Sequence, residues 1–142
     1  IPFAFANGHI HLCGGTLMEM SPAVDGGRIL AHYLPEIVPH DTPTTLFLKT
    51  TRGALELYLR YLETWSPAER RPAIGQSVPL FYFRSIDWTV EQASRVRHYL
   101  NSGRVKEFAR HAMIQEYWKA ANESAAHEIY RNLLDSLLFR SL

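Results

Sequence analysis

Residues 42–64 read TPTTLFLKTTRGALELYLRYLET and are the stretch that decides the fold. Thr42 can cap the amino terminus of a helix, and Pro43 suits the first helical turn because its missing N–H would have no partner there. Leucines then recur on one face at helical spacing, at Leu55, Leu59 and Leu62. The stretch therefore predicts a long helix that runs to about Thr64.

Further helical signals lie in the second half of the chain. Thr89 and Gln92 have the spacing of a capping box, and the helix that begins there is expected to end at residues 101–103. Apolar stripes predict one more helix over residues 105–120 and a last one over residues 129–138. Helices therefore outnumber strands.

The remaining segments favour shorter elements. Residues 1–12 are expected to be extended, and residues 28–34 are expected to form a short helix that stops before Pro35. Residues 78–84 are rich in aromatic and β-prone side chains and predict a short strand, which Pro79 would place at a sheet edge or strand start.

The composition indicates a folded chain of ordinary type. It has 142 residues, of which 46% are hydrophobic and 20% charged, and this balance excludes a disordered chain. The net charge of +1 gives no strong basic footprint and argues against a nucleic-acid partner. No apolar run reaches the roughly 18 residues of a membrane helix, so no membrane partner is expected. We predict a mainly α single domain or fragment over residues 1–142, with one or two short β-strands.

Cys13 is the only cysteine, so no internal disulfide can form. This predicts a reducing compartment, and we expect a cytoplasmic protein. The chain begins with Ile1 rather than methionine, which suggests a processed product, an excised domain or a fragment. A helix over residues 14–20 would lower the pKa of the Cys13 thiol and make it a candidate nucleophile, whereas a lone cysteine is otherwise an inert, buried side chain.

Two neighbouring histidines, His9 and His11, are the candidate metal ligands. On an extended segment, alternation puts both rings and Cys13 on the same face. Two imidazoles so placed can bind one divalent ion, and Zn²⁺ or a similar metal would activate a water molecule there. Candidates for a third ligand are His40, Asp41, Asp87 and His111. The alternative is that both histidines are partly buried polar residues without a ligand.

Residues 5–15, FANGHIHLCGG, resemble the first barrel strand of the amidohydrolase superfamily, and most closely its adenosine-deaminase-like branch. The resemblance implies a metal-dependent hydrolase that deaminates a small-molecule substrate, with His9 and His11 as metal ligands. Cys13 stands where that family has an acidic residue. A (β/α)₈ barrel needs roughly 200 residues or more, so the resemblance implies an amino-terminal fragment that is inactive alone. Zinc binding that survives a His9→Ala, His11→Ala double substitution would contradict this site.

Residues 1–9, IPFAFANGH, are also similar to the signature of Fic domains, which are helical nucleotidyltransferases. The matching positions are Pro2, Phe3, Ala6, Asn7 and Gly8. Ile1, Phe5 and His9 replace the catalytic histidine, the metal-binding acid and the phosphate-binding arginine of that family. This resemblance implies a degenerate Fic-like core.

A third hypothesis is a non-enzymatic helical interaction domain with a protein partner. It predicts no metal, no perturbed histidine titration and an exposed apolar groove. The aromatic residues are expected in the core, with some of them lining such a groove, and they are Tyr58, Tyr61, Trp65, Phe81, Tyr82, Phe83 and Trp88.

Overall fold

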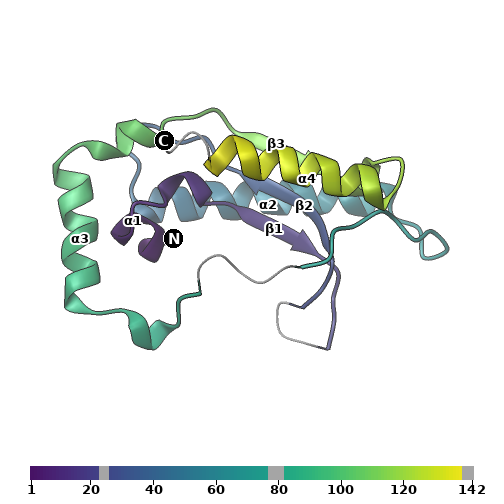
Figure 1. The fold of residues 1–142 in the computed structure, drawn as a ribbon, viewed down its shortest axis with the longest axis horizontal. Coiled ribbons are helices and arrows are strands. Elements are labelled where there is room, and N and C mark those ends of the chain that lie inside the picture. The colour runs from purple at the N-terminus through teal and green to yellow at the C-terminus, as the bar shows by residue number, and fades with distance from the viewer. Residues whose placement is uncertain (23–25, 77–81, 139–142) are drawn as a thin grey trace.

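The computed structural model describes residues 1–22, 26–76 and 82–138 (Figure 1). Within these ranges the chain forms four α-helices, three β-strands and four short 3-10 helices. In chain order they are α1 (Pro2–Ala6), η1 (Ile10–Leu12), β1 (Gly15–Met18), β2 (Ile29–Leu34), α2 (Pro43–Thr64), η2 (Ser85–Asp87), α3 (Val90–Asn101), η3 (Arg104–Phe108), β3 (Met113–Glu116), η4 (Tyr117–Lys119) and α4 (Glu123–Leu138). The prediction of a mainly helical chain with a few short strands is confirmed.

The three strands form one antiparallel sheet in the order β1-β2-β3. In the middle of the sheet, Thr16 pairs with His32, and His32 pairs with Gln115. β2 reads ILAHYL, and this almost continuous apolar run suits a central strand that is covered on both faces. The helix predicted over residues 28–34 is wrong, because so short a run has no period that separates a buried strand from a helix.

Two helices enclose the sheet, with α2 behind it and α4 in front of it in the view of Figure 1. From Ala31 to Leu34 the side chains of β2 alternate between them. Ala31 and Tyr33 belong to the cluster that contains Leu57 of α2, whereas Leu34 belongs to the cluster that contains Leu133 of α4. The sheet is therefore the middle of three layers.

Helix α2 begins and packs as its sequence suggests. The Thr42 hydroxyl accepts a hydrogen bond from the backbone N–H of Thr45, and the Thr45 hydroxyl accepts one from the backbone N–H of Thr42. A Cβ atom at Gly53 would lie 2.1 Å from the Tyr33 ring. Only glycine lets α2 approach β2 this closely, so the residue that weakens the isolated helix is the one that brings it onto the sheet.

The amino-terminal residues form short helices, so the extended segment predicted over residues 1–12 is wrong. Helix α1 ends at Ala6 with Asn7 as its cap, and Gly8 then turns the chain with a φ of +71°. These turns bring Phe5 and Ile10 into one buried cluster with residues of α2 and η3. In an extended chain, Phe5 and Ile10 would lie too far apart to share one cluster. Burial of both side chains therefore favours the helical turns over an extended segment.

The second half of the chain gives a mixed outcome for the predictions. Helix α3 begins after its cap Thr89, and α4 contains the predicted carboxyl-terminal helix. The helix predicted over residues 105–120 is wrong, because part of that segment pairs with β2 as strand β3. Of the strand predicted over residues 78–84, residues 78–81 lie outside the described ranges, and residues 82–84 are not in a strand.

Candidate functional site

The two histidines predicted to bind a metal lie in a helical turn rather than on a strand. His9 precedes η1 as its cap, and His11 lies within it. Their ring centroids are 6.2 Å apart, and the ring planes are inclined at 80°. The alternation that would place both rings and Cys13 on one face of a strand therefore does not apply here.

No third ligand is brought to this pair by the part of the chain that the structure describes. Within it, no group of three or more His, Cys, Asp or Glu side chains could hold a metal ion. Asp41 and Asp87 form ion pairs with basic side chains, and His40 and His111 are exposed. The zinc site at His9 and His11 stays a prediction.

Cys13 is buried, and burial raises the pKa of its thiol to about 11. The helix that would lower this pKa is not present, because Gly15 begins strand β1. The thiolate is the form that attacks substrates and binds metals, and a thiol with this pKa is almost fully protonated at neutral pH. The helix over residues 14–20, on which the hypothesis of a Cys13 nucleophile depended, is therefore wrong.

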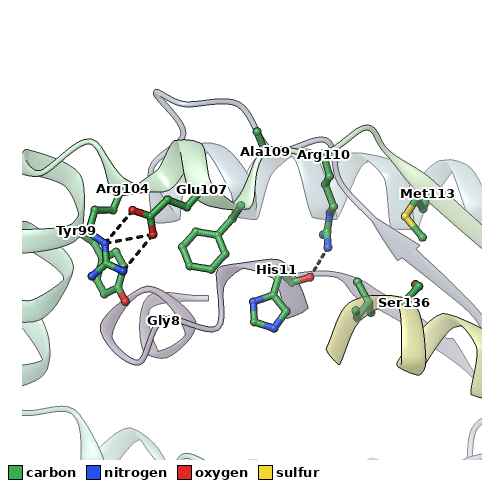
Figure 2. A pocket seen from close by; sticks show the side chains of 11 residues that line it. Gly8, His11, Tyr99, Arg104, Glu107, Ala109, Arg110, Met113 and Ser136 are labelled. Atoms are coloured by element: carbon green, nitrogen blue, oxygen red, sulfur yellow. Dashed lines mark hydrogen bonds and ion pairs between the residues drawn. The ribbon is translucent and has the colours of Figure 1, made fainter. Parts of the chain in front are cut away.

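A cavity of about 580 Å³ opens beside His11 (Figure 2). Its walls come from segments far apart in the sequence, namely the amino-terminal turns, the end of α3, η3, the start of β3 and the last turns of α4. The lining includes three rings, His11, Tyr99 and Phe108, and three charged side chains, Arg104, Glu107 and Arg110. A volume of this size falls within the range of roughly 300–1,000 Å³ that small-molecule sites occupy.

Arg110 ties the amino-terminal segment to the rest of the fold. Its guanidinium donates to the carbonyl oxygen of Pro35 at 3.1 Å, to that of Cys13 at 2.8 Å, and to that of His11 (Figure 2). One side chain thus holds the turns around His11 against the chain that follows β2. The sequence carries no signal for this role, because all three acceptors are backbone atoms.

The His11 ring lies flat against a neighbouring aromatic ring. Its centroid is 5.8 Å from that of Phe108, and the two planes are inclined by only 9°. Burial lowers the pKa of His11, and the nearby His9 and Arg110 lower it further. The imidazole is therefore largely neutral at neutral pH and offers the cavity a flat, uncharged wall.

A partly buried polar cluster that the sequence did not indicate lies between β2 and α4. The His32 Nδ1 atom is 2.8 Å from the Tyr117 hydroxyl, and the His32 ring stacks on Tyr130. Burial lowers the pKa of His32 to about 4 and raises the pKa of Tyr117. Both groups are therefore neutral at neutral pH. The lowered pKa of His32 differs from the unperturbed histidines expected of an interaction domain, and its cause is burial beneath α4.

The face of α2 that points away from the sheet carries a stripe of large apolar side chains. The opposite face meets the sheet and is buried at Leu46, Thr50, Gly53 and Leu57. Six side chains form what we term the outer face, and they are 44–61% exposed: Phe47, Leu48, Leu55, Tyr58, Leu59 and Leu62. None of the helices in the described ranges has the length and apolarity to cross a membrane.

Several aromatic residues predicted for the core are exposed. Trp65 is 52% exposed just after the end of α2, and the other exposed members of that set are Tyr58, Tyr82, Phe83 and Trp88. Tyr61 is partly buried against Trp118, with ring centroids 5.2 Å apart, and Phe81 lies outside the described residues. The prediction failed because periodicity shows that a helix has an apolar stripe without showing what covers it.

No protein-family model, curated protein or solved structure matches the sequence. The resemblances to amidohydrolases and to Fic domains therefore stay predictions. Function has to be argued from the surfaces that the chain itself presents.

Proposed function

We propose that this chain is a non-enzymatic helical interaction domain that pairs with a second copy of itself through the outer face of α2. One observation carries the proposal: six large apolar side chains are 44–61% exposed along a helix whose opposite face already meets the sheet. Single exposed leucines are ordinary in folded proteins, but a contiguous apolar stripe marks a surface that binds something.

The outer face has the area that a stable interface needs. Together with Trp65, its side chains present on the order of 800 Å², which is about what each partner contributes to an interface of standard size. The largest apolar patch on a typical monomeric protein is smaller, at roughly 300–600 Å². Leaving this surface in water would disfavour an isolated monomer.

The spacing along the helix supports a second copy as the occupant. Leu48, Leu55 and Leu62 recur every seven residues, the repeat with which two helices pack along one seam. Because Leu55 lies halfway, an antiparallel two-fold arrangement sets Leu55 against its own counterpart and Leu48 against Leu62 of the other copy. Antiparallel pairing also opposes the two helix dipoles favourably.

The charges beside the stripe support a protein surface rather than a lipid surface as the occupant. One flank of α2 carries three basic and two acidic side chains, which are Lys49, Arg52, Arg60, Glu56 and Glu63. A helix that lies on an anionic membrane is instead rich in Lys and Arg on its polar face. A flank of mixed charge also creates little net repulsion between two copies.

Sedimentation equilibrium on the full chain tests the proposal. The monomer has a mass of 16.3 kDa, and we expect the wild-type chain to sediment with twice that mass. Leu55→Glu should raise the dissociation constant about 100-fold or more, because pairing would bury two like charges at the two-fold axis. Val90→Glu is the matched control, since it places the same charge on an 88% exposed apolar residue of α3 and should leave the mass unchanged.

Two results would overturn the proposal. One is a wild-type chain that stays monomeric at its highest soluble concentration. The other is a dimer that Leu55→Glu does not dissociate although Leu55 is 57% exposed in the single chain. Thermal unfolding of the variant separates a lost interface from a lost fold, because an exposed substitution should leave the stability of the monomer nearly unchanged.

A further inference from the structure

Two oppositely charged residues, Arg52 and Glu56, lie at the edge of the outer face of α2. We infer that they select a second copy of this chain as the partner, because each forms an ion pair across the interface with the other residue of that copy. This inference rests on the proposed pairing through α2. It adds the residues that give the pairing its direction and its selectivity.

Helical geometry puts charged and aromatic residues at opposite edges of the outer face. Each residue of an α-helix turns the side-chain direction by about 100°. Relative to Leu55 at the centre, Arg52 and Glu56 therefore lie on one side, which we term the charged edge. Phe47 and Tyr58 lie on the other side, which we term the aromatic edge.

The direction of pairing decides which edges meet. In an antiparallel two-fold pair each edge lies against the same edge of the partner, so charged meets charged and aromatic meets aromatic. In a parallel pair the charged edge would lie against the aromatic edge. It would then lose water without gaining a partner of opposite charge. The two edges therefore favour the antiparallel pair.

The register set by Leu55 brings opposite charges together. With Leu55 on the two-fold axis, Arg52 lies three positions before the axis and Glu56 one position after it. The partner's Glu56 is therefore offset from Arg52 by two positions, which is about 3 Å along the helix and within reach of a long arginine side chain. The two-fold symmetry repeats this contact, so the interface contains it twice.

Arg52 and Glu56 can turn toward a second copy with little loss of stability. In the single chain the Arg52 Nε atom donates to Glu56 Oε1 at 3.1 Å, and the two side chains are 84% and 57% exposed. An ion pair this exposed contributes little to folding. The other basic side chains of this flank, Lys49 and Arg60, form ion pairs with acidic residues elsewhere in their own chain.

Opposite charge reversals in two separate chains test the inference. Arg52→Glu makes the charged edge acidic, and Glu56→Lys makes it basic, so each variant alone should dimerise with a dissociation constant about tenfold above the wild-type value. An equimolar mixture of the two variants should regain the wild-type constant, because its contacts join opposite charges again. Sedimentation equilibrium measures each constant. Recovery in the mixture also shows that both variants are folded.

Two controls isolate the electrostatic contribution. Arg131→Glu and Glu128→Lys make the same charge reversals at exposed positions of α4, and they should leave the dissociation constant unchanged both alone and mixed. Salt at about 1 M screens exposed charges and should bring the constants of the Arg52 and Glu56 variants close to that of the wild type.

The outcomes separate this inference from the proposal on which it rests. A wild-type chain that stays monomeric overturns both. A wild-type dimer overturns the charge pairing alone if either variant dimerises as tightly as the wild type, or if the mixture stays as weak as the separate variants. A loss of affinity that salt does not reduce has the same meaning.

Discussion

The two faces of α2 carry similar residues in opposite surroundings. Leu57 is 1% exposed in the cluster beneath the sheet, whereas Leu55, only two positions away, is 57% exposed. The apolar face of a helix is normally buried against a neighbour. Among the described residues, neighbours cover one apolar face of α2 and leave the other exposed. The proposed pairing through the outer face accounts for this difference.

Truncation on the inner face should have the largest effect on stability. Leu57→Ala leaves a cavity between α2 and the sheet and should lower the free energy of unfolding by about 2–5 kcal/mol. Leu55→Ala is the matched control and should change that of the monomer by no more than about 0.5 kcal/mol. Urea unfolding at low protein concentration measures both values. Equal losses would show that the two faces are equally buried and would remove the contrast.

The pH dependence of stability should test the burial of His32 in the layer between β2 and α4. The pKa of His32 is about 4 in the folded chain, against an ordinary value of 6.5. At a pH between these two values, the His32 imidazole is protonated in the unfolded chain and neutral in the folded chain. The stability linked to His32 is thus fully present above pH 6.5, and about 3 kcal/mol of it is lost as the pH falls to 4.

His32→Gln should remove this acid dependence and keep a polar partner for Tyr117. His98→Gln, at an exposed position of α3, should preserve it. Unfolding midpoints followed across the same pH range give the readout. A wild-type chain whose stability does not change between the two pKa values would mean that water reaches the layer between β2 and α4.

The sequence correctly predicts those parts of the fold that depend on interactions between residues close together in the chain. The caps at Thr42 and Thr89 mark the starts of α2 and α3, because a cap needs only residues three positions away. The sheet was missed because its causes are distant. Leu34 pairs with Met113, and neither segment has a local sequence pattern that predicts this pairing.

The same limit applies to the candidate sites. The stripe on α2 is visible in the sequence at Leu55 and Leu59, but its outward direction follows from how the sheet packs against Gly53. His11 stands out by residue type, yet the arginine that binds its carbonyl lies 99 positions further along the chain. The residue types in a sequence indicate candidate site residues. Which other residues surround them is known only from the folded structure.

Disulfide trapping at position 55 tests the central claim most directly. Leu55→Cys would carry one accessible thiol, because Cys13 is the only natural cysteine and is buried with a pKa of about 11. Mild oxidation should convert this variant almost completely into a covalent dimer. Val90→Cys, at an even more exposed position on α3, should remain largely monomeric. If Leu55→Cys forms the linked species no faster than Val90→Cys, two copies of the chain do not meet through α2.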